Sequence, residues 1–236
     1  MNQVMKVALW VSGAILLVIL IQYPIQQTTD SWDSWSLPLA GQVIVLDPGH
    51  GGVDGGAVGV EETLEKDISL IVTKKIRDYL QQSGALVYMT RESDRDLAAT
   101  DTKGIANRKV EDIKNRVAFI NGKEPDFFLS IHLNALPATQ WSGAQTFYYP
   151  GLEKSENLAK SIQDEIKRNL ENTNRDVLAI NNMYLLKHTN PPGALVEIGF
   201  LSNAHERELL KTTSYQTKMA ASIYEGILHY ATSDNE

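Results

Sequence analysis

The sequence predicts an α/β fold of three layers, in which a mostly parallel sheet is flanked by helices on both faces, preceded by an N-terminal hydrophobic helix. The first observation is that short apolar runs rich in β-branched residues alternate with longer segments of helical period. The second is the composition, because 43% hydrophobic and 22% charged residues over 236 positions are typical of a globular protein. The third is that no internal repeat is found.

The N-terminal 25 residues differ from the rest of the chain. Fifteen uncharged residues, VALWVSGAILLVILI, lie between Lys6 and Gln22. A membrane span typically needs ~20 residues, and a secretory segment is shorter. No A-x-A cleavage site follows, so we expect an uncleaved signal anchor, with a cleaved signal peptide as the alternative. Either predicts contact with the membrane and export, anchored or secreted, to the outer side of the cytoplasmic membrane.

Two further segments complete the expected organisation. Residues 26–41 are mostly polar and are interpreted as a linker. Residues 42–232 are expected to form one domain, whose first strand is Gln42–Asp47. Further strands are predicted, in chain order, at Ala85–Thr90, Phe127–His132, Ala144–Tyr149, near Met183–Leu186 and at Ala194–Ile198.

Apolar residues at a period near 3.6 predict the helices. They run from Leu64 to just before Gly84, from Val110 to Ile120 with Gly122 as the stop, from Leu158 to Leu170, and from about Tyr215 to Tyr230. Between the second strand and the second helix, residues 91–107 form a long polar stretch. A loop of this length is usually functional or mobile.

Composition excludes several kinds of site. The chain has no cysteine, so disulfides and thiolate metal sites are excluded, and a metal would be bound by His, Asp or Glu. The formal net charge of −7 argues against nucleic acid as a partner, because nucleic-acid binding depends on a positive field.

The first strand ends in a glycine-rich loop, within VIVLDPGHGGVDGG at residues 43–56. Glycines permit positive φ angles and allow the backbone to approach a ligand closely, and His50 lies among them. The glycines do not follow the G-x-G-x-x-G spacing, and no Gly-Lys-Ser/Thr follows, so neither nucleotide motif is present. The alternative is a tight turn that carries a surface histidine.

A second histidine is expected at the same edge of the sheet. His132 ends the third strand, and the carboxyl ends of parallel strands share one edge. Two histidines there, in a chain without cysteine, favour a metal. A catalytic zinc needs a third protein ligand. Glu65 is the best candidate because it opens the first helix at this edge of the sheet, but Glu61 and Glu62 compete with it and spacing alone does not choose among the three.

Three other residues are candidates for the site. Glu197 lies in the apolar strand ALVEIGF, where a buried carboxylate requires a partner or a raised pKa, either of which suits a general base. Asn134, two residues after His132, is a candidate for contact with the metal ligands or the substrate. Arg91 is a candidate for contact with an oxyanion or a substrate carboxylate, but a structural bridge to Asp47 or Glu92 is favoured over that role.

Four separated motifs resemble the zinc-dependent N-acetylmuramoyl-L-alanine amidases of the type 3 family. They are LDPGHGG with DGGAVG, the LEKD segment, SIHLNA and ALVEIGFLSN, and the resemblance covers roughly residues 43–230. It implies a zinc ion (Zn2+) held by His50, Glu65 and His132, with Glu197 as the catalytic acid/base. The resemblance therefore selects Glu65 from the three candidate acids.

The resemblance also implies an activity. The family hydrolyses peptidoglycan between the lactyl group of N-acetylmuramic acid and the L-alanine of the stem peptide. The segments WSLPLAGQVIVLDPGHGG and WSGAQTFYY are similar to its sporulation and germination branch, which implies formation of muramic-δ-lactam in the spore cortex, the forespore intermembrane space as location and an accessory protein in the spore envelope. The alternatives are a zinc peptidase acting on wall peptides and a catalytically degenerate wall-binding protein.

Overall fold

The computed structural model describes residues 2–22 and 37–233, and the chain divides into two units, Met1–Leu37 and Pro38–Glu236. The first unit contains one helix, α1 (Gln3–Gln22). Within the described ranges, no helix combines the length and the apolar character needed to cross a membrane. Most of the predicted linker, residues 26–36, lies outside the described residues. Leu39, near its end, is fully buried in the second unit.

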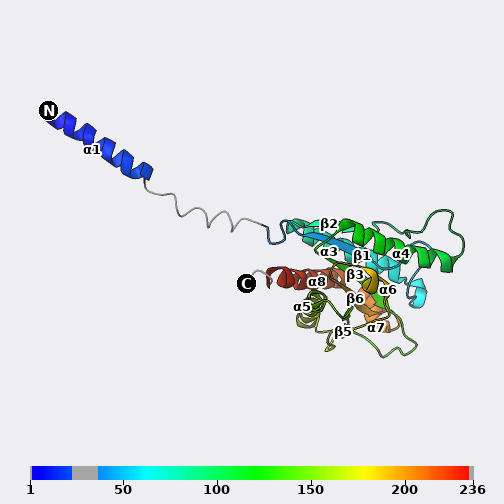
Figure 1. The fold of residues 1–236 in the computed structure, drawn as a ribbon. Coiled ribbons are helices and arrows are strands. Elements are labelled where there is room, and N and C mark those ends of the chain that lie inside the picture. Colours follow the sequence, from blue (N-terminus) through cyan, green and yellow to red (C-terminus); the bar gives the residue numbers. More distant parts are fainter. Residues whose placement is uncertain (1, 23–36, 234–236) are drawn as a thin grey trace. The chain divides into compact units, whose positions relative to one another are not determined.

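The second unit is built on a six-stranded sheet with the order β2-β1-β3-β6-β4-β5 (Figure 1). The strands are β1 (Val43–Pro48), β2 (Leu86–Met89), β3 (Phe127–Asn134), β4 (Gln145–Tyr148), β5 (Leu178–Ala179) and β6 (Gly193–Phe200). Neighbouring strands pair in parallel, except that β4 is antiparallel to β6. The predicted mostly parallel sheet is therefore confirmed.

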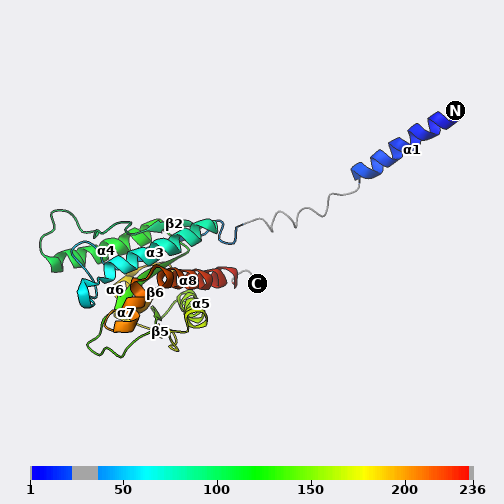
Figure 2. The ribbon, with the colours of Figure 1, turned by 180° about the vertical axis from the view of Figure 1, so that it is seen from behind.

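Helices cover both faces of this sheet, as predicted. One face carries α3 (Glu65–Gln82), α5 (Glu153–Leu170) and α8 (Thr213–Ser233), and α8 lies between the other two in both views (Figures 1 and 2). The other face carries α4 (Ile105–Lys123) and the short α6 (Tyr184–His188). A 3-10 turn, η1 (Val60–Glu62), and α7 (Ala204–Lys211) complete the unit.

Strand β1 shows how the sheet is buried between these layers. Ile44 and Leu46 pack into the core cluster under α3, α5 and α8, whereas Val45 packs into the smaller cluster under α4 and α6. All three side chains are fully buried. Successive residues of a strand point to opposite faces, so an apolar run without alternation is the pattern expected for a strand covered on both sides.

One predicted strand is wrong. The residues predicted as a strand near Met183–Leu186 begin the helix α6, in which Leu185 and Leu186 are buried, and the fifth strand is instead Leu178–Ala179. A short apolar run does not distinguish a buried strand from one helical turn. Met, Leu and Lys favour the helix here, because their unbranched or γ-branched side chains lose little freedom in it.

The predicted end of the second helix is also corrected. Gly122 does not stop α4, which continues to Lys123 and ends where Glu124 takes a left-handed φ of 46°. One glycine costs a helix only ~1 kcal/mol relative to alanine, and packing against the sheet outweighs that cost. The helix α7 was not predicted, since its eight residues are mostly polar.

Two helical glycines provide a matched stability test. A Cβ on Gly226 of α8 would overlap the backbone of Ile162 in α5, whereas a Cβ on Gly122 of α4 would meet nothing within 4 Å. We expect Gly226→Ala to lower the free energy of unfolding by about 1–3 kcal/mol through overpacking. Gly122→Ala is expected to raise it by up to about 1 kcal/mol, because alanine favours the helix. Urea unfolding followed by circular dichroism measures both, and equal effects would contradict the described helix packing.

Candidate metal and catalytic site

The candidate site lies at the carboxyl edge of β1 and β3. β1 ends at Pro48, which pairs with Ile131, so that the loop after β1 lies beside His132. His50 takes a left-handed φ of 60°, which is uncommon outside glycine. A Cβ on Gly49 would overlap the ring of His132. The space left by this glycine is thus filled by the His132 ring, and the approach of a ligand to the other glycines of the loop stays a prediction.

Three predicted residues come together at this edge. One ligand atom each from His50, Glu65 and His132 lies within 4.8 Å of the others. Glu65 Oε2 is 3.1 Å from His50 Nε2, and Glu65 Oε1 is 2.9 Å from His132 Nδ1. The structure therefore groups Glu65, the first residue of α3, with both histidines. Glu61 and Glu62 belong to η1 and are not part of this cluster.

Backbone donors fix the Glu65 carboxylate. The Ala57 amide donates to Oε2 (2.6 Å) and the Leu133 amide donates to Oε1 (2.9 Å). Burial alone would raise the pKa of Glu65, but the bonds to His132 and His50 hold it well below its ordinary value. Glu65 is therefore an ionised, oriented carboxylate although only 2% of it is exposed.

A second acid orients His50 from the other side. Asp54 Oδ2 lies 2.8 Å from His50 Nδ1, which leaves Nε2 turned toward Glu65. Asp54 also accepts from the Gly56 amide (3.1 Å) and pairs with Lys109 Nζ (2.7 Å). Burial opposes the charged imidazole, yet the bonds to Asp54 and Glu65 raise the pKa of His50 to about 9. Carboxylates that bind the far nitrogen of a histidine commonly fix its orientation in metal sites.

Glu197 lies across the strands from His132, its register partner in β6. Burial raises the pKa of Glu197 to about 7, with His132 lowering it and Glu65 raising it by smaller amounts. Among the residues that the structure describes, its buried Oε2 has no hydrogen-bond partner. Glu65 and Glu197 are thus carboxylates in opposite environments: Glu65 is buried, hydrogen-bonded and ionised, whereas Glu197 is half-buried and its Oε2 has no partner among the described residues.

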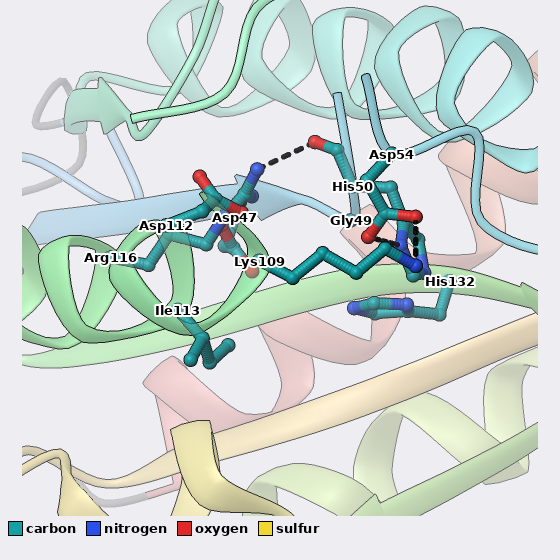
Figure 3. Close-up of a pocket in the computed structure, with 9 residues that line it drawn as sticks. All are labelled: Asp47, Gly49, His50, Asp54, Lys109, Asp112, Ile113, Arg116 and His132. Atoms are coloured by element: carbon teal, nitrogen blue, oxygen red, sulfur yellow. Dashed lines mark hydrogen bonds and ion pairs between the residues drawn. The ribbon is translucent and has the colours of Figure 1, made fainter. Parts of the chain in front are cut away.

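The histidines border a small pocket of about 90 Å³ (Figure 3). His50 and His132 lie side by side at one end, with ring centroids 5.0 Å apart, and Lys109 extends along the pocket to Asp54. Arg116 lies at the other end (Figure 3).

A buried ion pair fixes the backbone that carries His50. Arg116 of α4 pairs with Asp47 Oδ1 (2.7 Å) and, through Nε, with Asp112 (2.9 Å). The same guanidinium donates to the carbonyl oxygens of Pro48 (2.8 Å) and His50 (2.5 Å). Arg116 therefore orients the strand end and the loop together.

Arg91 contributes to the same support. It is 1% exposed and donates to the carbonyl oxygens of Pro48 (3.1 Å), Gly49 (2.8 Å) and Lys66 (2.8 Å). The predicted bridge from Arg91 to Asp47 or Glu92 is wrong: among the described residues Asp47 pairs with Arg116 and Glu92 with Arg77, because these guanidinium groups lie closer to the two acids. These contacts favour a structural role for Arg91, and its contact with substrate stays a prediction.

Asn134 lies at the end of β3, beyond an irregularity in the β3–β6 register. Its carbonyl oxygen accepts a hydrogen bond from the Leu201 amide (2.7 Å). The role of its side chain toward metal ligands or substrate stays a prediction.

The long polar loop after β2 is tied to the site. Asp94 accepts from the Gly52 amide (2.8 Å), and Lys66 Nζ bridges Asp94 Oδ2 and the Gly52 carbonyl at 2.8 Å each. These bonds indicate an ordered wall beside the glycine loop.

Sequence reasoning did not identify Asp54, Lys109 or Arg116. Asp54 is four residues after His50 in HGGVD, and an acid at that spacing from a predicted ligand is a local signal for it. Lys109 and Arg116 lie on an amphipathic helix in which charged residues are ordinary, so no local signal distinguishes them.

Comparison with known proteins places the chain in a family. A model described as N-acetylmuramoyl-L-alanine amidase matches residues 44–229. The germination-specific N-acetylmuramoyl-L-alanine amidase of Bacillus subtilis is 54% identical over 230 residues, 96% of either chain. The amidase LytC of the same organism is 32% identical over 82% of this chain and 36% of its own.

The chain is also similar to solved structures of N-acetylmuramoyl-L-alanine amidases. The CwlD amidase of Clostridioides difficile, solved in complex with the GerS lipoprotein, is 42% identical, with a TM-score of 0.80. The match covers 82% of this chain and 100% of that one. An N-acetylmuramoyl-L-alanine amidase of Clostridium difficile 630 is 28% identical, with a TM-score of 0.72 over 81% of this chain and 97% of that one.

Replacement of Arg116 tests the buried pair. Arg116→Met leaves Asp47 and Asp112 buried without their partner, and we expect the free energy of unfolding at pH 7 to fall by about 3–5 kcal/mol. The matched control is Arg77→Met, which breaks ion pairs to exposed acids and is expected to cost about 0–1 kcal/mol. Urea unfolding measures both variants, and similar costs would contradict a buried pair.

The Arg116–Asp47 pair also predicts how the stability of the fold depends on pH in the acid range. Burial opposes ionisation, but Arg116, Ser130 and Thr90 lower the pKa of Asp47 from 3.8 to about 2. Its stabilisation is therefore present above pH ~4 and is lost as the pH falls through about 2. In Arg116→Met, the free energy of unfolding should fall less between pH ~4 and ~2 than it does in the wild type. If its dependence on pH were the same in both proteins, Asp47 would not be the source of the acid sensitivity.

Proposed function

The chain belongs to the N-acetylmuramoyl-L-alanine amidase family, and from this premise we propose that it is a zinc-dependent peptidoglycan hydrolase. The bond cut is the amide between the lactyl group of N-acetylmuramic acid and the L-alanine of the stem peptide. The observation that carries the zinc dependence is the convergence of His50, Glu65 and His132 next to the half-buried Glu197, the register partner of His132.

The donor set fits zinc. Two imidazoles and one carboxylate are ligands that zinc prefers, and catalytic zinc sites use three protein ligands with one open position. Ligand atoms within 4.8 Å of one another match a single ion shared by the three side chains. Backbone amides hydrogen-bond Glu65, and Asp54 hydrogen-bonds His50. Metal ligands are usually oriented by hydrogen bonds of this kind.

The chemistry that zinc supplies when bound is Lewis acidity toward the scissile carbonyl and the attacking water. The proposed role of Glu197 is to accept the proton of that water during attack on the lactyl carbonyl. It then delivers this proton to the departing nitrogen of L-alanine, because an amine anion is a very poor leaving group. The free Oε2 of Glu197 supports this role, since no other described group occupies it.

A sporulation setting is part of the proposal. It rests on the 54% identity to a germination-specific amidase and on the similarity to the CwlD amidase. Spore-cortex peptidoglycan is the proposed substrate, and formation of muramic-δ-lactam the proposed outcome. Because the CwlD amidase was solved with a lipoprotein, we include an accessory protein in the spore envelope.

Export follows from such a substrate, which lies outside the cytoplasm. The uncharged run within the first 25 residues supports export as a signal anchor or signal peptide. The proposed location is the outer side of the cytoplasmic membrane, in the forespore intermembrane space.

Product analysis tests the bond that is cut and its dependence on metal. We expect the purified protein to release stem peptides beginning with L-alanine from spore-cortex peptidoglycan and defined muropeptides, as identified by mass spectrometry. Chelation should abolish the release and added zinc should restore it, because the three ligands hold the ion that the reaction needs.

Three other outcomes of this experiment would contradict the amidase proposal or its zinc dependence. Cleavage between two amino acids would replace the amidase proposal with the zinc peptidase. Binding to the wall without cleavage by the zinc-loaded protein would favour the degenerate wall-binding protein. Full activity of metal-free protein would overturn the zinc proposal.

Glu197→Gln separates metal binding from proton transfer. The variant should bind zinc as the wild type does, because the three ligands are unchanged, and should lose about 10²–10⁴-fold in kcat because an amide does not transfer the proton. Metal content by mass spectrometry and steady-state kinetics on a defined muropeptide measure the two properties.

The matched control is Glu208→Gln, which removes the charge of an exposed glutamate paired with Lys211. It should retain both zinc and activity. A fully active Glu197→Gln protein would remove Glu197 from its proposed role.

A further inference from the structure

A second pocket, of about 440 Å³, lies at the same edge of the sheet as the candidate metal site. Two segments distant in sequence line it: the end of the β3–β4 connection and the connection from α5 to β5. The lining residues are Ser142, Glu171, Asn172, Thr173, Asn174 and Arg175. Hydroxyl and amide groups predominate among them, so the pocket offers many neutral hydrogen-bond donors and acceptors.

The two segments are held firmly together. Arg175 donates to the carbonyl oxygens of Ser142 and Gly143, at 2.7 Å each. Gly143 has a φ of +87°, and a Cβ there would overlap the Asn172 carbonyl oxygen, so only glycine permits this approach. The Gln163 side chain donates to the Arg175 carbonyl (3.1 Å). The pocket wall is thus built by specific contacts.

An aromatic ring stands beside this pocket. Trp141 precedes Ser142, and 47% of it is exposed. The Arg175 guanidinium lies 5.8 Å from the centre of the Trp141 ring and 5.4 Å from that of Phe200. These cation–π contacts hold an exposed tryptophan in place next to a polar pocket.

The register of the sheet places the pocket near Glu197. Gln145, the first residue of β4, pairs directly with Glu197 of β6. The Cα atoms of two paired residues are about 5 Å apart. Ser142 precedes Gln145 by three residues, which corresponds to about 10 Å at the usual rise of a strand. A polymer bound in the pocket therefore reaches the proposed general base within the length of a few sugar units.

We propose that Trp141 and this polar pocket form a subsite that binds the glycan strand of the substrate. A sugar ring presents C–H groups on its faces and hydroxyl or N-acetyl groups at its rim. The faces match an exposed indole, and the rim matches the hydroxyls and amides of Ser142, Thr173 and Asn174. The proposal rests on the proposed function, in that the glycan is taken to be that of peptidoglycan.

A hydrogen bond fixes one wall of the pocket from behind. The Asn172 side chain donates to the Tyr215 hydroxyl (2.7 Å), which joins the connection after α5 to α8. The polar wall is therefore held in place before a ligand binds, which lowers the entropic cost of binding.

Binding of glycan that lacks peptide tests the subsite separately from hydrolysis. The full chain is titrated calorimetrically with peptide-free strands of alternating N-acetylglucosamine and N-acetylmuramic acid, and in parallel with the free stem peptide. We expect the glycan to bind, and Trp141→Ala to raise its Kd by about tenfold or more. Trp141→Phe, which keeps an aromatic face, should restore most of the affinity.

Tyr184→Ala is the matched control, since Tyr184 is an aromatic residue, 39% exposed, on α6 at the other face of the sheet. It should leave the Kd unchanged. If Trp141→Ala does not fold, as judged by circular dichroism, Asn174→Ala in the exposed pocket wall should also weaken glycan binding.

Two results would overturn the subsite: a wild-type protein that does not bind the glycan, or a Kd unaffected by both pocket variants. The subsite would also be overturned if the pocket variants weakened binding of the stem peptide and left binding of the glycan unchanged. Failure of the amidase proposal is seen separately, as glycan binding that depends on Trp141 without release of stem peptides.

Discussion

The buried pair of Arg116 and Asp47 is the constraint on which the candidate metal site depends. Asp47 is the penultimate residue of β1, and it also accepts hydrogen bonds from Thr90 and Ser130 (2.6 Å each), next to β2 and in β3. One carboxylate thus joins three neighbouring segments of the sheet to a helix. A buried charge is tolerated only when it is paired and its remaining lone pairs are bonded, and Asp47 meets both conditions. The pair also fixes the backbone at His50, because Arg116 donates a hydrogen bond to the His50 carbonyl oxygen.

This arrangement explains how His50 keeps an uncommon backbone conformation. A left-handed φ is unfavourable for a residue with a side chain, and it persists only where the surroundings impose it. Arg116 and Arg91 bind the three successive carbonyl oxygens of residues 48–50, while Asp54 and Glu65 hold the imidazole. Both the backbone and the side chain are therefore fixed, which is the preorganisation that a metal ligand needs.

The sequence predicted what depends on local pattern. Strands such as β1 and β6, and helices with a clear apolar period such as α3, were located to within a few residues, and the edge rule for parallel sheets brought His50 and His132 together. It did not predict α6, where a short apolar run fits either structure. Nor did it predict Arg116 or the pocket beside Trp141, because these depend on contacts between segments up to 69 residues apart, for which neither period nor composition carries a signal. The position of Glu65 at the start of a helix favoured it among three acids, the family resemblance settled the choice, and the structure places it as the first residue of α3, in one cluster with both histidines.

The single antiparallel pairing in the sheet relates the two candidate sites. Because β4 runs against β6, its first residue, Gln145, lies beside Glu197 at the carboxyl edge, and the segment before it projects beyond that edge. β5 is parallel to β4, so the connection that precedes β5 arrives at the same edge and supplies the rest of the pocket. A parallel β4 would begin at the Gly193 end of β6, and the segment with Trp141 would lie on the far side of the sheet. The reversal of one strand thus gives the sheet edge two different surfaces: the His50, Glu65 and His132 cluster, and a polar pocket in which hydroxyl and amide side chains predominate. In the proposed complex one polymer contacts both.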